Sequence, residues 1–309
     1  MKRAVSEAEN SFGNGAVFIE KYLSKPRHIE IQILADQHGN VVHLFERDCS
    51  IQRRHQKIVE EAPSPVVSEE LRAIMGEAAC NVARSCNYHG AGTVEFIFEN
   101  NSFYFLEMNT RLQVEHPVTE MITGLDLVEE QINIAKGEKL AISQKDLNLN
   151  GHAIEIRVCA EDPYNNFMPD TGIIKLYDIP KGTGVRVDDC TKKGSEVSIY
   201  YDSMISKLIV HADNRVEAIK KMINAINNYT IYGLKTTLPF CKYALTHSDF
   251  RSGNFDTGFV NLYIEDYKSM VDENNSNKVG LAAIFQLYKM DKISTYFLPS
   301  TATNWVRNS

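Results

Sequence analysis

Residues 93–117 constrain the fold of this chain more than any other stretch, because two alternating segments there flank a short polar turn. Residues 93–99 read TVEFIFE and residues 103–108 read FYFLEM, with Asn100, Asn101 and Ser102 between them. β-Branched and aromatic residues alternating around an Asn-rich turn predict a β-hairpin. If the turn has three residues, Glu95 faces Glu107 on one side of the hairpin. A two-residue turn places Glu107 opposite Val94 instead.

A facing pair of glutamates predicts a metal site, because two carboxylates across a ladder repel unless a cation lies between them. Carboxylate oxygens are ligands that suit Mg²⁺ or Mn²⁺. In extended geometry the face of Glu107 continues up to Pro117 through four polar residues: Asn109, Arg111, Gln113 and Glu115. Arg111 is suited to bind an anion and Glu115 to act as a base. The alternative is a solvated edge strand whose charges serve solubility.

The remaining sequence predicts a mixture of antiparallel strands and helices, which is typical of an α+β domain. Strands are predicted at 29–33, 41–44 and 151–161, and a small antiparallel sheet at 172–210. Ser68, Asp126 and Asn214 are predicted to begin amphipathic helices. We expect a polar basic loop at 47–57, a strand end at 17–23, and a polar linker at 272–278 leading to a last short helix.

Charge and composition exclude several classes of function. A net charge of −7 gives no general field for nucleic acid, and the cluster RRHQK at 53–57 has no neighbouring aromatic on which a base could stack. That cluster is either a solvated loop or a contact for a nucleotide or small oxyanion. No apolar run reaches the roughly 18 residues of a membrane span, so no membrane association is expected. The six cysteines form no C-x-x-C pair, and we expect a cytoplasmic location, or the mitochondrial matrix if the full-length chain has a transit peptide.

Four segments, residues 20–30, 46–57, 107–120 and 157–163, together resemble biotin carboxylase, the ATP-grasp ligase component of biotin-dependent carboxylases. The resemblance runs in order from about Val17 to about Tyr263. The runs RRHQK at 53–57 and RLQVEHP at 111–117 mark the biotin carboxylase branch. It implies an α+β fold made of an ATP-grasp C-terminal domain and a biotin carboxylase C-terminal domain, with a largely antiparallel sheet and packed helices. The sequence departs from the family at its N-terminus, where we expect the family's Rossmann-like domain to be absent.

The resemblance also implies a role for each matching residue. ATP is expected to contact Glu20, Lys21, Leu23, His28, Gln52, His55, Glu95 and Glu107. Mg²⁺ or Mn²⁺ is expected on Glu95, Glu107 and Asn109, and bicarbonate on Lys57, Arg111, Gln113 and the Val114 backbone. The implied catalytic residues are Arg111, Glu115, which deprotonates bicarbonate to form carboxyphosphate, and Arg157, which binds biotin and stabilises its ureido oxygen.

The implied domain boundaries are 1–22 for a remnant of the ATP-grasp lid, 23–137 for the ATP-grasp C-terminal half, 138–265 for the biotin carboxylase C-terminal region and 266–309 for an extension. The implied partners are a biotin carboxyl carrier protein or domain, a carboxyltransferase component and a second copy in a homodimer. The implied setting is an acetyl-CoA or propionyl-CoA type carboxylase, as in fatty acid biosynthesis. Without a lid to close over the phosphates, we expect this chain alone to have little turnover. The alternatives are another ATP-grasp ligase, such as a carbamoyl phosphate synthetase relative, or a non-catalytic dimerisation module.

Overall fold

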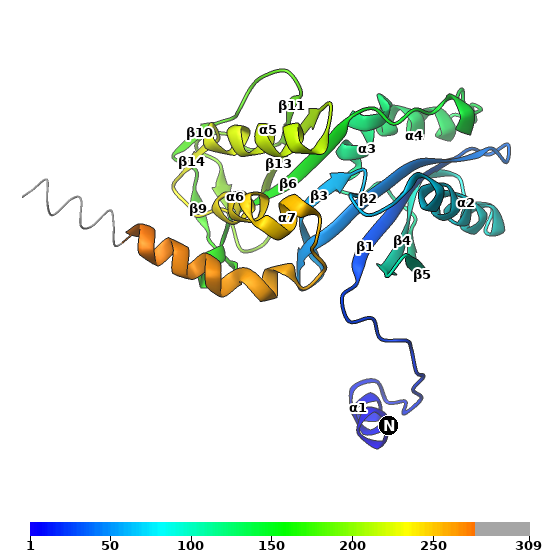
Figure 1. Cartoon of the computed structure of the whole chain (residues 1–309), viewed down its shortest axis with the longest axis horizontal. Coiled ribbons are helices and arrows are strands. Elements are labelled where there is room, and N and C mark those ends of the chain that lie inside the picture. Colours follow the sequence, from blue (N-terminus) through cyan, green and yellow to red (C-terminus); the bar gives the residue numbers. More distant parts are fainter. Residues whose placement is uncertain (276–309) are drawn as a thin grey trace, which may run out of the picture.

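The fold is built on one large antiparallel sheet (Figure 1), seen in a computed structural model that describes residues 1–275. The sheet has eight strands in the order β11-β13-β6-β3-β2-β1-β4-β5. In that order they span Val185–Asp189, Met204–Ala212, His152–Cys159, Gln56–Ala62, Val41–Arg53, Arg27–Ala35, Gly90–Glu99 and Ser102–Asn109. The α+β fold class predicted from the sequence is confirmed.

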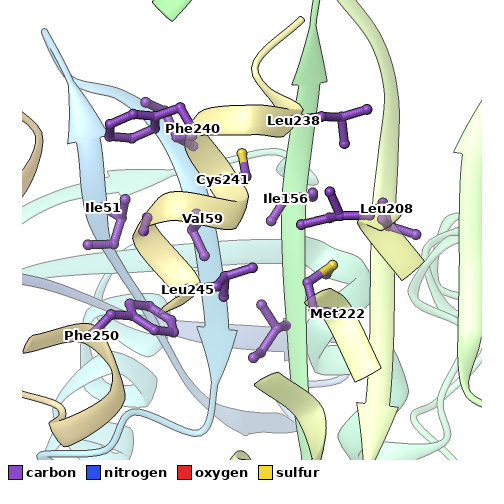
Figure 2. Packing of buried hydrophobic residues seen from close by; sticks show 14 of the residues in the cluster. Ile51, Val59, Ile156, Leu208, Met222, Leu238, Phe240, Cys241, Leu245 and Phe250 are labelled. Atoms are coloured by element: carbon purple, nitrogen blue, oxygen red, sulfur yellow. The ribbon is translucent and has the colours of Figure 1, made fainter. Parts of the chain in front are cut away.

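Helices cover both faces of this sheet. On one face, α2 (Glu69–Ser85) packs over Ile29, Ile31 and Val94, while α5 (Arg215–Asn227) and α6 (Leu238–Thr246) pack over Ile154 and Ile156. Helix α2 and the helices α5 and α6 lie on the same face of the sheet. Directly paired residues point to the same face, and successive pairs connect Ile29 on β1, through β2 and β3, to Ile154 on β6. Figure 2 shows the core beneath α5 and α6, where Phe240, Leu245 and Met222 meet Val59 and Leu208: the main hydrophobic cluster of the described residues.

The opposite face is covered in part by two short helices, α3 (His116–Thr123) and α4 (Leu127–Ala135). Val118 and Ile122 of α3 pack on Ala62 and Ala153 of the central strands. Between these contacts the central strands β1, β2, β3 and β6 present charged side chains, among them Glu30, Arg47, Glu60 and Glu155, all fully buried. The candidate site lies on this face.

The predicted helix starts are confirmed by their caps. The side chains of Ser68, Asp126 and Asn214 each accept a hydrogen bond from a backbone N–H of the first turn, at Leu71, at Val128 and Glu129, and at Glu217 respectively. The remaining helices are α1 (Lys2–Phe12), α7 (Ser248–Ser252), two single-turn helices (Gln144–Asp146 and Pro163–Asn165) and a helix over residues 259–275. Three small ladders complete the described part of the chain: β7–β8, β9–β12 and β10–β14. Their strands span Glu161–Asp162 (β7), Met168–Pro169 (β8), Gly172–Ile173 (β9), Leu176–Asp178 (β10), Glu196–Val197 (β12) and Thr230–Tyr232 (β14).

The predicted polar loop at 47–57 is wrong: these residues form the end of β2, a tight turn and the start of β3. Both turn residues, Arg54 (φ 49°) and His55 (φ 67°), adopt the left-handed conformation. Local composition misled the prediction because Arg47, Asp48 and Lys57 are buried and have charged partners on other strands.

The hairpin of β4 and β5 is confirmed, but its turn has two residues, Asn100 (φ 52°) and Asn101 (φ 57°), and Glu99 faces Ser102. Both positive φ values match the type I′ turn that suits the twist of a hairpin. A bulge between Phe96 and Glu95 then shifts the ladder by one residue, so Glu95 faces Glu107 after all. The predicted pairing of the carboxylates is therefore confirmed, through a register that differs from the predicted one near the turn.

Two terminal predictions are wrong. Residues 17–23 form no strand, and an irregular segment joins α1 to β1, because the residues there have no partner strand to hydrogen-bond. Residues 259–275 form a helix that includes most of the expected linker, and the predicted last short helix lies outside the described residues. No helix within residues 1–275 combines the length and the apolarity that crossing a membrane requires.

A single sheet joins the two segments that the resemblance assigns to separate domains. β3, from the expected ATP-grasp half, pairs with β6, from the expected C-terminal region, through four residue pairs from Val59–Ile156 to Ala62–Ala153. The division at residues 137 and 138 remains a proposal.

Candidate active site

A groove of about 780 Å³ collects most of the predicted site residues. Its walls come from the β2–β3 hairpin, from β4 and β5, from the segment that leads into α3, and from β6. The predicted residues that line it are His28, Gln52, His55, Lys57, Glu95, Glu107, Asn109, Arg111, Gln113, Val114, Glu115 and Arg157.

Three predicted ATP contacts do not line this groove. Glu20 and Lys21 are exposed and Leu23 is half-buried, all in the irregular segment before β1. Lys21 Nζ lies 2.5 Å from the Tyr104 hydroxyl and 4.6 Å from the centre of its ring, on the outer strand β5.

The predicted metal ligands converge at one end of the groove. Asn109 Nδ2 donates a hydrogen bond to Glu95 Oε1 (3.1 Å) and another to Glu107 Oε1 (3.0 Å). One amide nitrogen thus takes the place between two carboxylates where a cation would relieve their repulsion. The donor set of two carboxylates and an amide, which can rotate to present its oxygen, fits Mg²⁺ or Mn²⁺.

Glu95 is held ionised in the groove. Burial works against its charge, but the close approach of His28 Nε2 (2.9 Å) and the charge of Lys57 (3.2 Å) lower the pKa of Glu95 to about 2. Glu95 therefore remains a carboxylate throughout the neutral range, as a metal ligand requires.

Lys57 joins three carboxylates at the floor of the groove. Its ammonium lies 2.5 Å from Glu30, 2.5 Å from Glu115 and 3.2 Å from Glu95. Burial opposes the charge, but these carboxylates raise the pKa of Lys57 well above its ordinary value. All three ammonium protons have an acceptor, so Lys57 positions Glu115 from the side away from solvent.

Glu115 lies between two cations. One of its oxygens binds Lys57 and the other accepts a hydrogen bond from Arg157 Nη2 at 2.9 Å. Arg157 is itself held by Glu60, whose Oε1 accepts a hydrogen bond from Arg157 Nε at 2.6 Å. Glu115 is 2% exposed and immediately precedes α3, where the polar segment from β5 ends.

Arg111 provides an exposed positive charge beside the predicted metal ligands, and Arg54 also lines the groove and is exposed. The Arg111 guanidinium donates to Asn109 Oδ1 at 3.2 Å and forms no ion pair within the described residues. Neighbouring Gln113 is 5% exposed and donates to Glu95 at 2.8 Å. Val114 lines the groove, and its backbone carbonyl accepts a hydrogen bond from Lys207 Nζ at 2.9 Å.

Sequence reasoning missed the residues that support this groove from below: Glu30, Arg47, Glu60, Glu155 and Lys207. Arg47 is fully buried and its guanidinium donates five hydrogen bonds, to Glu30, Gln32, Thr93, Gln113 and Thr119. The signal was a charge in the middle of an apolar strand, as at Glu30 between Ile29 and Ile31. Such a strand has a core on one side and a buried polar layer on the other.

Two known protein families match two consecutive parts of the chain. Residues 1–143 match the family described as carbamoyl-phosphate synthase L chain, ATP binding domain, and residues 155–262 match the biotin carboxylase C-terminal domain. The chain is 52% identical over 265 residues to biotin carboxylase 1 of Bacillus subtilis, covering 85% of this chain and 59% of that protein. It is 52% identical over 258 residues to biotin carboxylase 2 of the same organism, covering 83% and 58%.

Among solved structures, the biotin carboxylase domain dimer of Hydrogenobacter thermophilus 2-oxoglutarate carboxylase, in complex with MgADP, ADP and bicarbonate, superposes with a TM-score of 0.81. Its sequence identity is 48%, and the match covers 86% of this chain and 59% of that one. The fold and the two family matches define an ATP-binding domain of the ATP-grasp type joined to a biotin carboxylase C-terminal domain. The chain belongs to the biotin carboxylase family and spans less than two thirds of the length of these two curated relatives.

Proposed function

We propose that the chain contributes the site for ATP- and bicarbonate-dependent carboxylation of biotin on a carrier protein, through carboxyphosphate. The observation that carries this proposal is the position of Glu115, a buried carboxylate held by Lys57 and Arg157 in the same groove as the Glu95 and Glu107 pair. A base, an anion-binding arginine and a divalent metal site in one groove are what the transfer of a phosphoryl group to bicarbonate requires.

The first step uses the end of the groove near Asn109. Glu95, Glu107 and Asn109 would hold Mg²⁺ or Mn²⁺, which when bound neutralises charge on the ATP phosphates. Gln52 and His55, on the β2–β3 hairpin, line the same groove and would contact the nucleotide. Glu20, Lys21 and Leu23 remain proposed ATP contacts through the segment before β1.

The second step uses the polar segment between β5 and α3. Arg111, Gln113, the Val114 backbone and Lys57 would hold bicarbonate beside Glu115. Glu115 takes the proton of bicarbonate, and the resulting oxygen forms a bond to the γ-phosphorus as the bond to ADP breaks. Carboxyphosphate and ADP are the products.

The last step uses Arg157. Carboxyphosphate releases CO₂, and phosphate takes the proton from the biotin ureido nitrogen, which then bonds to CO₂. The guanidinium of Arg157 stabilises the negative charge that develops on the ureido oxygen. Arg157 is suited to this role because its pKa is raised above the ordinary arginine value by Glu60 and Glu115 despite burial, so it stays charged.

We propose the same partners as the resemblance implies: a biotin carboxyl carrier, a carboxyltransferase component and a second copy of the chain. A cytoplasmic or mitochondrial matrix location is part of this proposal, since one relative is named as the mitochondrial methylcrotonoyl-CoA carboxylase alpha chain of Glycine max.

The test is equilibrium binding of ADP to the chain with and without Mg²⁺. We expect Mg²⁺ to strengthen binding and Glu107→Gln to weaken the Mg²⁺-dependent affinity by about tenfold or more, because losing even a residue that only orients a metal ligand costs about 10–100-fold in metal affinity. Glu107 is exposed, so the variant should fold. Glu129→Gln, at an exposed glutamate on α4, is the matched control and should bind like the unchanged chain. Equal affinities with and without Mg²⁺, or an unaffected Glu107→Gln, would contradict the proposal.

A further inference from the structure

Five buried glutamates, four on the sheet face beneath the groove and one at the start of α3, gather around the groove, and four of the five have a cation as partner. Glu30 contacts Arg47 and Lys57, Glu95 and Glu115 contact Lys57, and Glu60 contacts Arg157. The fifth, Glu155, is fully buried, and neither of its carboxylate oxygens has a hydrogen-bond partner among residues 1–275.

Glu155 lies directly opposite Glu60 in the ladder between β6 and β3. Side chains that face each other in this way have their Cβ atoms about 4.5–5.5 Å apart. Glu60 Oε1 accepts the hydrogen bond from Arg157, but Glu60 Oε2 is buried and has no partner among the same residues. The two facing residues therefore have three buried oxygens without a donor, and a single proton would join them.

We propose that Glu60 and Glu155 share one proton at neutral pH, carried by Glu155, and that this pair positions Arg157 toward Glu115. In this arrangement Glu155 donates to the free oxygen of Glu60, which leaves the other oxygen of Glu60 for the guanidinium. The role of the pair in catalysis rests on the proposed function, whereas the shared proton does not.

The electrostatic surroundings agree with one retained proton. Burial, opposed by Arg157 and reinforced by Glu115, raises the pKa of Glu60 above its ordinary value. Burial and the charge of Glu60 raise the pKa of Glu155 well above its ordinary value, although Lys207 on β13 and Arg157 on β6 act in the opposite direction. Lys57 on β3 and Glu115 at the start of α3 are the other charged groups that face the pair. Two coupled carboxyls of this kind titrate as a unit.

A shared proton makes stability depend on pH in a characteristic direction. Between the ordinary glutamate pKa of 4.5 and the raised value in the folded chain, the folded state binds one proton more than the unfolded state. The unfolding equilibrium constant therefore rises about tenfold per pH unit from this pair alone. Glu155→Gln supplies a permanent neutral donor of the same shape, so it should remove this dependence.

The experiment is urea unfolding of the chain from pH 5 to pH 8, comparing Glu155→Gln with the unchanged chain. We expect the ratio of their unfolding constants to change about tenfold per pH unit within this range, in favour of the variant as the pH rises. Glu46→Gln is the matched control, since Glu46 is also a fully buried strand glutamate, on β2, but it is paired with Arg72. Its ratio should be constant over the same range. A constant ratio for Glu155→Gln would overturn the proposal.

Two further measurements keep the proposal testable if Glu155→Gln does not fold. The unchanged chain should show an infrared carbonyl band of a protonated carboxyl at pH 7, and no such band would overturn the proposal. The Arg157 Nε–H signal in a nitrogen-15 NMR spectrum should shift as the pair titrates, and an unshifted signal would refute the positioning role. Both are measured without nucleotide or bicarbonate, so a failure of Mg²⁺-dependent ADP binding leaves them interpretable.

Discussion

Replacing Arg47 by methionine tests the most concentrated set of polar contacts in the structure. The guanidinium is fully buried and lies 2.6 Å from Glu30, 2.6 Å from Gln32 and 2.9–3.1 Å from Gln113, Thr119 and Thr93. Methionine has a similar length and no donor. It therefore leaves Glu30 with Lys57 at 2.5 Å and His28 at 3.7 Å but without its arginine partner, and leaves buried acceptors unsatisfied.

The expected cost follows from the burial of both charges. Breaking a buried ion pair by removing one partner costs about 3–5 kcal/mol, because the remaining charge is left without compensation. The five hydrogen bonds belong to the same network and do not add separately. Since a domain is stable by about 5–15 kcal/mol, Arg47→Met should remove a large share of the stability.

The assay is urea unfolding at pH 7, with Arg84→Met as the control. Arg84 forms an ion pair with Glu77 on the exposed side of α2, with 44% and 61% of the two side chains accessible, so its loss should cost less than about 1 kcal/mol. The double variant Arg47→Met with Glu30→Gln should be less destabilised than the sum of the single variants, because no unpaired charge remains. Equal costs for Arg47→Met and Arg84→Met would refute this reasoning.

Two further predictions concern β3 and the β4–β5 turn. His152 and Arg215 outweigh burial and lower the pKa of Glu61 to about 2, so Glu61→Gln should cost about 3 kcal/mol at pH 7. Because the pKa of Glu61 is lower in the folded than in the unfolded chain, this stabilisation exists above pH 4.5 and is lost as the pH falls toward 2. The same loss of unfolding free energy for Glu61→Gln at pH 7 and at pH 3 would contradict the prediction. Asn101 has a φ of 57° in the β4–β5 turn, a conformation that glycine adopts easily and alanine does not. Asn101→Ala should therefore lower stability by about 1 kcal/mol, while Asn101→Gly should not. Thermal unfolding measures both effects, and equal melting temperatures for the two variants would contradict this turn conformation.

Predictions from the sequence succeeded where the signal was local. The caps at Ser68, Asp126 and Asn214 depend on a side chain and a backbone N–H within three residues of each other. The two strands of the hairpin at 93–109 were predicted by alternation, and the facing of Glu95 and Glu107 was predicted as well. The bulge that produces this facing could not be read from the sequence, since a one-residue shift in a ladder leaves the alternation of each strand intact.

Predictions failed where a partner distant in sequence decides the outcome. The polar run at 47–57 was expected to be a loop, yet Arg47 and Lys57 are buried beside Glu30, 17 and 27 residues away in the chain. The charge of each of these residues is acceptable in a strand only because another strand supplies the opposite charge. Composition alone cannot report that arrangement.

The sequence by itself determined the α+β class, the starts of the main helices, the carboxylate pair and the resemblance to biotin carboxylase, because each depends on neighbouring residues or on motif order. Only the tertiary structure decided that Glu115 lies between Lys57 and Arg157, and that Glu155 faces Glu60 while its own carboxylate has no hydrogen-bond partner among residues 1–275. These contacts join residues that are up to about a hundred positions apart in the chain. Their energies are large because the residues are buried: where water is excluded, the protonation and position of a charged group depend mainly on the nearest charged group.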